Sequence, residues 1–215
     1  MLNAFRKSMM QEFEMTDLGK LQYFLGLEVS QSEEGVSVSQ RKYARDLLKK
    51  FRMEDCDIAI TPMNTNEKLQ RNDGTSPTDE RLYRSIVGGL NYLTHTRPDI
   101  AYSVSVVSRF LHSPTKQHLG AAKRISRYIA RTAEKGIWYE ASENFKLVVY
   151  IDSDWAGSLD DRKSTSGSVF TLGSGAITWS SKKQDIVALS STEAEYITSG
   201  AAGRQAIYVV EKIID

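Results

Sequence analysis

The stretch of residues 147–157 constrains the fold more than any other part of the chain. It reads Leu-Val-Val-Tyr-Ile-Asp-Ser-Asp-Trp-Ala-Gly, so an apolar, β-favouring run ends abruptly in two carboxylates and a glycine. This pattern predicts a buried strand that ends at the edge of a sheet. Asp152 is therefore expected at the mouth of that strand.

A Ser/Thr cluster followed by acids lies further along the chain and predicts a helix start. Ser190 and Glu193 stand at the spacing of a capping box, and Thr192 with Glu195 offers an alternative register. Glu195 is expected on the first turns of this helix. A strand-end Asp that faces a helix Glu is half of a site for a hard cation such as Mg²⁺, which binds a few carboxylate oxygens and keeps several waters.

Composition limits the classes of protein to which the chain can belong. Of its 215 residues, 40% are apolar and 26% are charged, which excludes a chain that is disordered throughout. The single Cys56 lacks both a disulfide partner and the other ligands of a zinc site, as expected in a reducing compartment. No apolar run reaches the length of a membrane span, and the N-terminus does not resemble a signal peptide. We therefore expect an intracellular, cytoplasmic protein without a membrane partner.

The net charge of +1 hides an uneven distribution. Residues 41–131 contain 17 Lys and Arg against 9 Asp and Glu, a net charge of +8, and the rest of the chain carries −7. A basic block between acidic ones is typical of a protein whose middle part holds a polyanion. On charge alone, an equally good interpretation is that these cations cover solvated helix faces.

The spacing of apolar residues along the first quarter of the chain predicts a helix, a β-hairpin and a second helix. Residues 5–13 fit a short amphipathic helix, and residues 23–29 and 36–40 alternate like the two strands of a β-hairpin. Residues 41–51 return to a helical period with one apolar side. The basic residues on the rest of that helix are candidates for phosphate binding: Arg41, Lys42, Arg45 and Lys49.

Residues 56–79 show no sustained period and are rich in turn-forming residues, which predicts a linker. Helical patterning resumes over residues 80–96, 98–111 and 114–132, and these three helices in succession predict a small bundle. The last helix carries a basic surface suited to a nucleic-acid backbone: Lys123, Arg124, Arg127 and Arg131.

The final unit is predicted to begin at Gly136. Its expected strands cover residues 137–139, 145–151, 167–172 and 176–181. The last two form a hairpin, and a helix from about Thr192 follows. From strand 145–151 onward, the predicted order is three strands and then a helix.

Seven blocks follow one another along nearly the whole chain. They are Asp-Leu-Gly-Lys-Leu-Gln-Tyr-Phe-Leu-Gly-Leu-Glu-Val at 17–29, Ser-Gln-Arg-Lys-Tyr-Ala at 39–44, Tyr-Arg-Ser-Ile-Val-Gly-Gly-Leu at 83–90, Thr-Arg-Pro-Asp-Ile-Ala-Tyr at 96–102, the Asp152 stretch, Lys-Ser-Thr-Ser-Gly at 163–167 and Ser-Ser-Thr-Glu-Ala-Glu-Tyr at 190–196. In these blocks and their order, the chain resembles the Pol polyprotein of copia-type LTR retrotransposons, from the end of the reverse transcriptase into ribonuclease H.

The resemblance implies an α+β fold, with a palm-end β-hairpin and helical thumb and connection followed by an incomplete ribonuclease H-like module. The segments it implies are the end of the palm and start of the thumb at 1–54, a linker at 55–79, helical thumb and connection at 80–135, and a truncated ribonuclease H-like domain at 136–215. The implied partners are RNA–DNA hybrid or primer-template and the remainder of the Pol polyprotein, while the oligomeric state stays open.

Ribonuclease H domains of this family cut the RNA of an RNA–DNA hybrid with four carboxylates and two Mg²⁺ ions. By resemblance, Asp152 and Glu195 are two of these catalytic residues and metal ligands, and we expect their side chains to converge on one pocket. The other two acids and the Tyr-x-Asp-Asp motif of the polymerase are absent, so we expect no DNA synthesis and negligible hydrolysis. The alternative is a degenerate or host-adopted nucleic-acid-binding remnant without catalysis.

The resemblance also predicts an open edge, because the strand that lies beside the first ribonuclease H strand in the family is absent here. We expect either that another part of the chain buries this edge or that the domain is marginal and aggregation-prone. Several other residues have a plainer interpretation. We expect Asp154 to act in a turn and Asp160 and Asp161 to be loop charges. The histidines at 95, 112 and 118 lack metal-ligand spacing and are expected to be structural or on the surface. The aromatic residues Tyr150, Trp155, Trp179 and Tyr196 are expected in the core.

Overall fold

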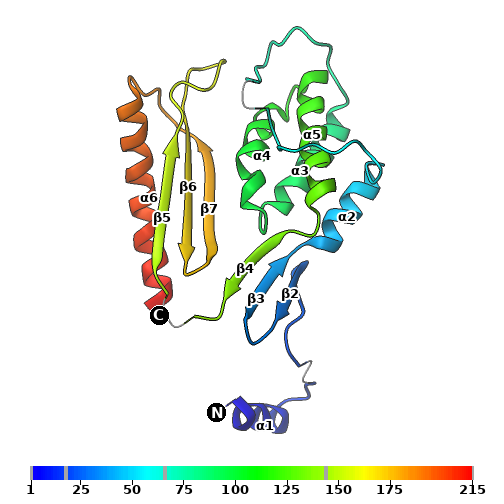
Figure 1. The fold of residues 1–215 in the computed structure, drawn as a ribbon, viewed down its shortest axis with the longest axis vertical. Helices are drawn as coiled ribbons and strands as arrows, with labels where there is room; N and C mark the ends of the chain where they lie inside the picture. Colours follow the sequence, from blue (N-terminus) through cyan, green and yellow to red (C-terminus); the bar gives the residue numbers. More distant parts are fainter. Residues whose placement is uncertain (1, 17–18, 65–66, 143–144, 215) are drawn as a thin grey trace.

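The computed structural model describes residues 2–16, 19–64, 67–142 and 145–214, and it contains a helical bundle and two antiparallel sheets (Figure 1). The helices are α1 (Leu2–Glu12), α2 (Arg41–Lys50), α3 (Glu80–Leu93), α4 (Ala101–Val107), α5 (Lys116–Thr132) and α6 (Ser191–Ile214). The strands are β1 (Tyr23–Phe24), β2 (Leu27–Gln31), β3 (Gly35–Ser39), β4 (Gly136–Glu140), β5 (Leu147–Ser153), β6 (Thr165–Leu172) and β7 (Gly175–Lys183). Short 3-10 helices, Pro98–Ile100 and Ser108–Phe110, flank α4. This mixture agrees with the expected α+β class.

The first sheet has the strand order β1-β2-β3-β4, and its first hairpin departs from the sequence prediction. The strand expected over residues 23–29 is two strands, because Leu25 and Gly26 turn the chain back between Phe24 and Leu27. Both turn residues have a positive φ, 47° and 75°, as in the two-residue turns whose twist suits a hairpin. The Tyr92 hydroxyl donates to the Leu25 carbonyl at 2.6 Å and holds this turn against α3.

Strand β4 corrects the predicted beginning of the final unit. The strand expected over residues 137–139 is present, but it pairs with β3, where Ile137 faces Val38 and Tyr139 faces Val36. The β2–β3 hairpin would otherwise expose one edge of β3, and β4 covers that edge. The chain therefore returns to the first sheet after α5, and the two sheets divide after Glu140 rather than at Gly136.

Helices α2 to α5 enclose the larger apolar core. Its buried side chains recur every three or four positions along the helices, as an amphipathic pattern requires. They include Leu47 and Leu48 from α2, Tyr83, Ile86 and Leu90 from α3, Val104 and Val107 from α4, and Ile125 and Ile129 from α5. This bundle is the predicted one, although the helix expected over residues 98–111 is a short α4 between two 3-10 helices.

The segment of residues 55–79 was expected to be a linker, and its described part contains no helix and only an isolated bridge at Pro77. It nevertheless packs against the bundle. His118 at the start of α5 accepts from the Thr115 N–H through Nδ1 and donates to the Gln70 carbonyl through Nε2, both at 3.0 Å. Burial lowers the pKa of His118, and its ring stacks on Phe110. A neutral, structural histidine therefore ties this segment to the bundle.

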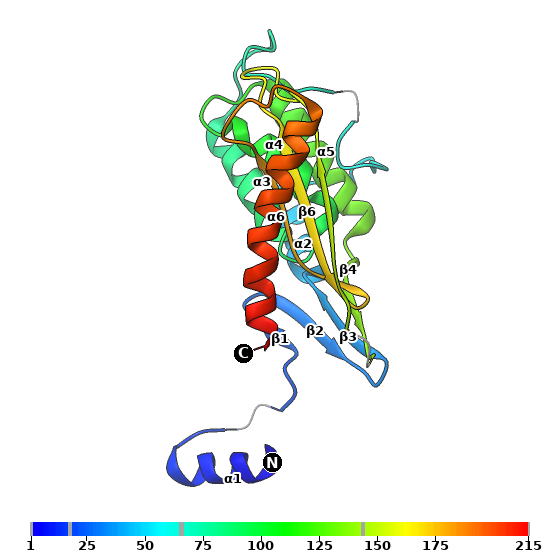
Figure 2. The same ribbon diagram turned by 90° about the vertical axis from the view of Figure 1, so that its left-hand side faces the viewer.

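The C-terminal unit, made of β5, β6, β7 and α6, shows the predicted order of three strands and a helix. Its sheet has the order β5-β6-β7, and α6 packs on one face over β5 and β6 (Figure 2). Within the described part of the chain no strand pairs with the outer edge of β5. The expectation of core aromatics is wrong for Tyr150, Trp155 and Tyr196, which are exposed.

The bundle covers the other face of this sheet on the side of β7. The Trp179 indole N–H donates to the Thr94 carbonyl at 2.9 Å, and the Ser105 and Ser181 hydroxyls are hydrogen-bonded at 2.9 Å. The sheet is thus the middle of three layers, between α6 and the bundle (Figure 1). No helix in the described ranges has the length and apolarity needed to cross a bilayer.

Candidate nucleic-acid interface and the predicted metal site

Strand β5 carries Asp152 near its end, as predicted, and its register decides where that side chain points. Asp152 faces Gly167 in β6, and Ser153 faces Ser166. The Ser166 hydroxyl contacts the Thr198 hydroxyl of α6 at 2.6 Å, so this pair of serines lies on the α6 side. Successive side chains of a strand project to opposite faces, so Asp152 projects away from α6.

Glu195 lies on the first turns of α6, also as predicted. The helix start is held by Ser190, whose Oγ accepts from the Glu193 N–H at 3.1 Å, and by Glu193, whose Oε2 accepts from the Leu189 N–H at 2.7 Å. One turn further on the same helix, the Glu195 Oε1 accepts from the Ser153 N–H at 3.2 Å. Glu195 therefore reaches the end of β5 from the α6 side.

The two carboxylates therefore come to the end of β5 from different elements, Asp152 from the strand itself and Glu195 from α6, where it binds the outward-pointing N–H of the residue after Asp152. Asp152 lines a cavity of about 480 Å³ together with Asp154 and Tyr102, on the side of the bundle, and Glu195 is not among the residues that line it. The convergence of Asp152 and Glu195 on one pocket stays a prediction.

The residues present do not fit a two-magnesium site. A magnesium ion takes near-octahedral oxygen ligands, so its protein carboxylates must gather around one point. In the described ranges no group of three or more His, Cys, Asp or Glu side chains is placed to hold a metal ion. The resemblance assigns two carboxylates, and one oxygen of Glu195 accepts the Ser153 N–H. The catalytic role of Asp152 and Glu195 stays a prediction.

Asp154 closes the loop between β5 and β6, in agreement with the turn role expected for it. Its Oδ1 accepts from the Thr165 N–H at 2.5 Å, and its own N–H donates to the Thr165 carbonyl at 3.2 Å. Later in the loop, Asp161 pairs with Lys183 at 2.5 Å. Burial alone would raise the pKa of Asp161, but hydrogen bonds from Lys183 and Ser158 lower it to about 2.

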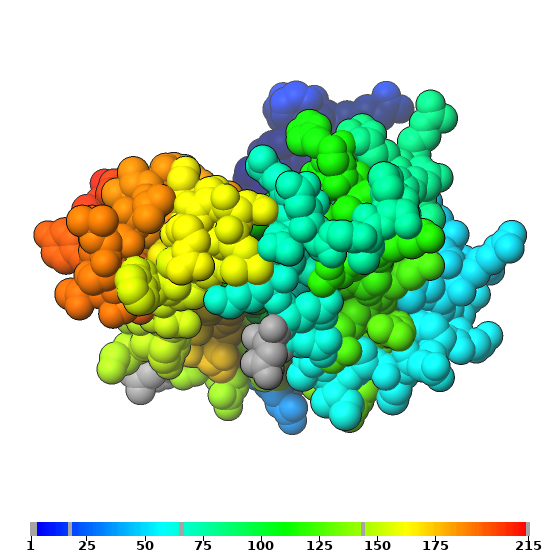
Figure 3. Space-filling model, turned by 90° about the horizontal axis from the view of Figure 1, so that it is seen from above, coloured from blue at the N-terminus to red at the C-terminus, as the bar shows by residue number. Residues whose placement is uncertain are grey.

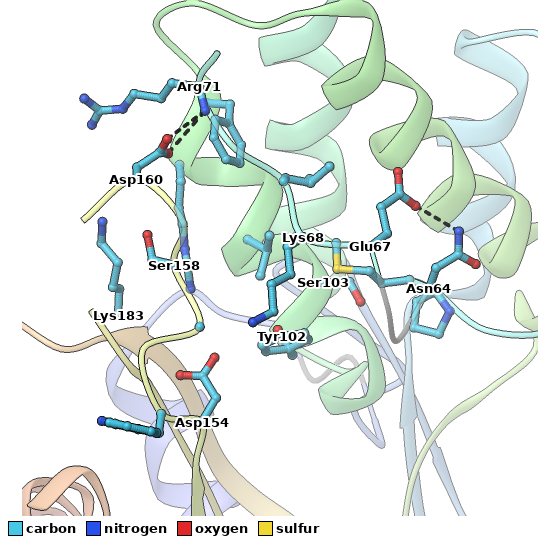
Figure 4. A pocket seen from close by; sticks show the side chains of 18 of the residues that line it. Asn64, Glu67, Lys68, Arg71, Tyr102, Ser103, Asp154, Ser158, Asp160 and Lys183 are labelled. Carbon is cyan, nitrogen blue, oxygen red and sulfur yellow. Dashed lines mark hydrogen bonds between the residues drawn. The ribbon is translucent and has the colours of Figure 1, made fainter. Parts of the chain in front are cut away.

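A cavity of about 650 Å³ lies where this loop meets the bundle and the segment of residues 55–79 (Figure 4). From above, the yellow loop abuts the blue-green atoms of that region (Figure 3). The Arg71 N–H donates to both Asp160 oxygens, at 3.0 and 3.3 Å, and joins the two sides. The walls carry both signs of charge, including Arg109, whose pKa burial lowers. Sequence reasoning missed this cavity because its lining comes from segments far apart in the chain.

The four cations predicted on α2 all lie on its exposed side, opposite the buried Ala44, Leu47 and Leu48. Two of them are engaged in ion pairs, Arg41 with Glu28 at 3.3 Å and Arg45 with Glu134 at 2.5 Å. Lys42 and Lys49 are exposed and lie two turns apart on one side of the helix. The phosphate-binding role expected for the α2 cations stays a prediction.

The four cations predicted on α5 divide into two kinds. Lys123 and Arg131 are exposed. Arg124 and Arg127 are half-buried, because the segment of residues 55–79 crosses them: Arg124 donates to the Thr61 hydroxyl at 2.9 Å, and the Ala59 N–H donates to the Arg127 carbonyl at 3.4 Å. The predicted basic surface of α5 is therefore smaller than its sequence suggests.

Comparison with known proteins identifies the family. Residues 1–65 match the family described as reverse transcriptase (RNA-dependent DNA polymerase). Over 86% of its length the chain is 47% identical to the retrovirus-related Pol polyprotein from transposon RE1 of Arabidopsis thaliana, and over 93% it is 39% identical to that from transposon TNT 1-94 of Nicotiana tabacum. The chain belongs to the copia-type retrotransposon Pol polyproteins.

The chain spans only a small part of these Pol polyproteins, 13% of the RE1 protein and 16% of the TNT 1-94 protein. A shorter relative is an uncharacterized mitochondrial protein of Arabidopsis thaliana, 39% identical over 91% of the chain, of which the chain covers 81%. The comparison with solved structures gives no significant match.

One block by which the chain resembles copia-type Pol proteins forms a buried polar cluster in the bundle. The Arg97 guanidinium donates to both Asp99 oxygens, at 2.9 and 2.7 Å, and to the Thr132 carbonyl at 2.8 Å. The Tyr128 hydroxyl donates to Asp99 at 2.8 Å. Charge counting did not reveal this cluster, because it counted Arg97 among the cations available to a polyanion.

Proposed function

We propose that the chain is the part of a retrotransposon Pol polyprotein that joins the end of the reverse transcriptase to a ribonuclease H-like module, and that it holds RNA–DNA hybrid or primer-template through α2 and α5. The observation that carries this proposal is the match to Pol polyproteins over most of the chain, combined with the exposed cations of these helices. Phosphate contacts from lysine and arginine supply sequence-independent affinity, as a protein that follows any hybrid needs.

The proposal divides the chain into the segments inferred from its sequence. Residues 1–54 would end the palm and begin the thumb, residues 55–79 would be a connecting segment, residues 80–135 would complete the helical thumb and connection, and residues 136–215 would form the truncated ribonuclease H-like domain. The pairing of β4 with β3 qualifies the last boundary, because residues 136–140 belong to the first sheet. The match of residues 1–65 to the reverse transcriptase family supports the first segment.

Binding should depend on salt and on the exposed lysines of α2. We expect Lys42→Glu with Lys49→Glu to weaken binding of an RNA–DNA hybrid about tenfold and to reduce the slope of log K against log[salt] by about 2, since each lost phosphate contact removes about one released counterion. Fluorescence anisotropy of a labelled hybrid between 50 and 200 mM salt measures both quantities. Lys20→Glu with Lys182→Glu, at two exposed lysines outside α2 and α5, is the matched control. Equal effects of the two double variants would contradict a binding role for α2.

The isolated chain should bind hybrid without cutting it. Cleavage in the family uses four carboxylates, of which the resemblance assigns two here, Asp152 and Glu195, and within the described residues no group of three or more His, Cys, Asp or Glu is placed to hold a metal ion. We expect no Mg²⁺-dependent release of labelled RNA from a hybrid that the chain demonstrably binds. Cleavage that disappears in Asp152→Asn would show instead that these residues rearrange into an active site.

The second candidate is a remnant, degenerate or adopted by its host, that binds nucleic acid without catalysis or does not bind it. The mitochondrial relative favours it, because the chain covers 81% of that protein and only 13% of the RE1 polyprotein. Salt-sensitive binding of hybrid without cleavage fits either a Pol fragment or a binding remnant. Absence of binding to RNA and to hybrid at low salt would leave only a remnant without a nucleic-acid role.

A further inference from the structure

The main-chain hydrogen-bonding groups of β5 divide between β6 and the outer edge of the sheet. The Lys146 carbonyl accepts from Gly173 at 3.1 Å, and the Asp154 N–H donates to Thr165 at 3.2 Å, so the even-numbered positions turn toward β6. The Ser153 N–H points away from β6 to Glu195. Because alternate residues of an antiparallel strand face opposite sides, Leu147, Val149 and Ile151 present their N–H and carbonyl groups at the outer edge.

This outer edge is accessible and apolar. Across the described residues no strand pairs with it, and Val149 and Ile151 are 37% and 39% exposed. Unpaired apolar edges favour pairing with a strand of another chain. The bundle contacts this sheet through β7, at the edge opposite β5.

We propose that this edge pairs with β5 of a second copy of the chain, around a two-fold axis at Val149. In this antiparallel register Val149 faces its own counterpart, and Leu147 faces Ile151 of the second copy. All three outward-facing residues then form hydrogen-bonded pairs, about six N–H to carbonyl bonds in total. The same register sets Lys146 opposite Asp152 of the second copy, at two symmetric places, so opposite charges meet. The strand is thus self-complementary in hydrogen bonding and in charge.

The position of α6 is compatible with this dimer and adds to its interface. Directly opposed residues of paired strands project to the same face, so both copies of α6 lie on one face of the joined sheet. Each α6 lies over β5 and β6, and neighbouring strands are about 4.8 Å apart, so the two helices come within the usual packing distance of about 8–10 Å.

The flank of α6 that faces the open edge suits close contact between two helices. Glu195 marks this flank through its bond to Ser153. At helical spacing it continues as Ser199, Gly203, Ala206 and Val210, without a charge and with small side chains near the two-fold axis. Arg204 belongs to the opposite flank, where it lines a cavity with β6 and β7. A second copy therefore meets a neutral, small-residue surface.

Sedimentation equilibrium of the full chain without nucleic acid tests the proposal. We expect a monomer–dimer equilibrium in the wild type. Lys146→Glu and Asp152→Lys should each raise the dimer dissociation constant about tenfold, because each change sets like charges opposite each other at two places. The double variant Lys146→Glu with Asp152→Lys restores opposite charges and should restore the wild-type constant. A monomer at all concentrations up to about 1 mM, the range of very weak association, overturns the proposal.

Hydrogen exchange locates the interface. The amides of Val149 and Ile151 should exchange more slowly as the protein concentration rises, while the amides of Val148 and Tyr150, which face β6, should not change. A dimer that forms without this protection, or that both single charge reversals leave unchanged, uses another surface and also overturns the proposal. Circular dichroism of each variant confirms that it is folded.

Discussion

Replacing Arg97 with alanine is expected to lower the free energy of unfolding by about 3 kcal/mol. The Arg97 side chain is 3% exposed, and it donates to Asp99 and to both the carbonyl and the hydroxyl of Thr132. Its removal leaves the Asp99 carboxylate without its cation, which costs far more than the contact contributes as an isolated pair, while the Thr132 carbonyl keeps the Lys135 N–H as a donor at 3.0 Å. Asp99 is itself 37% exposed, so water compensates for part of the loss.

Urea unfolding monitored by circular dichroism measures this loss. Arg81→Ala removes an exposed arginine of α3 and should change stability by no more than about 0.5 kcal/mol. Arg97→Lys keeps the charge but not the planar fork that contacts both Asp99 oxygens, so its loss should be intermediate. If Arg97→Ala were as mild as Arg81→Ala, the cluster would have no structural importance.

The Arg97–Asp99 ion pair also makes the stability lost in Arg97→Ala depend on pH. Burial alone would raise the pKa of Asp99, but the hydrogen bonds and charge of Arg97, with the Tyr128 hydroxyl, hold that pKa below its ordinary value. A carboxylate with a lowered pKa stabilises the fold above its ordinary pKa of about 4, and this stability is lost as the pH falls through the lower folded value. The difference between wild type and Arg97→Ala should therefore shrink on acidification below about pH 4.

The elements that could be predicted from the sequence are those whose pattern is local. The amphipathic period of α2, the alternation of β5 and the capping residues before α6 each lie within one short window, and each element is present. The turn at Leu25 and Gly26 was missed because leucine seldom adopts a positive φ, and its contact with Tyr92 comes from a distant helix. The pairing of β4 with β3 was missed because it depends on the unpaired edge of β3, a strand that lies far from β4 in the sequence.

The candidate site was less predictable than the elements that carry it. The sequence placed Asp152 near the end of a strand and Glu195 on the first turns of a helix, and both positions are correct. Which face each side chain occupies depends on the register with β6 and on the side where α6 packs, and neither is encoded in a local motif. Arg124 shows the same limit, because a segment far away in sequence crosses it.

The second large effect is expected in the C-terminal unit, where Phe170→Ala should lower the free energy of unfolding by about 3–5 kcal/mol. Phe170 is fully buried between the sheet and α6. Among the described residues, the cluster around Phe170 has two other buried apolar members, Ala202 and Val209, whereas nineteen form the core of the bundle. Leu147, Ile177 and Ala206 also pack against Phe170, so removing its ring loses these contacts and leaves a cavity, and both effects destabilise the fold.

The small size of this core also determines which elements should lose protection against hydrogen exchange in Phe170→Ala. Protection against hydrogen exchange should fall in β5, β6, β7 and α6 while α3 and α5 keep theirs, because the bundle core does not include Phe170. Phe13→Ala makes the same chemical change at an exposed position and should leave stability within about 0.5 kcal/mol of wild type. A uniform loss of protection in the bundle and in the C-terminal unit would contradict this expectation. It would mean that the two units unfold together because the contacts between β7 and the bundle couple them strongly.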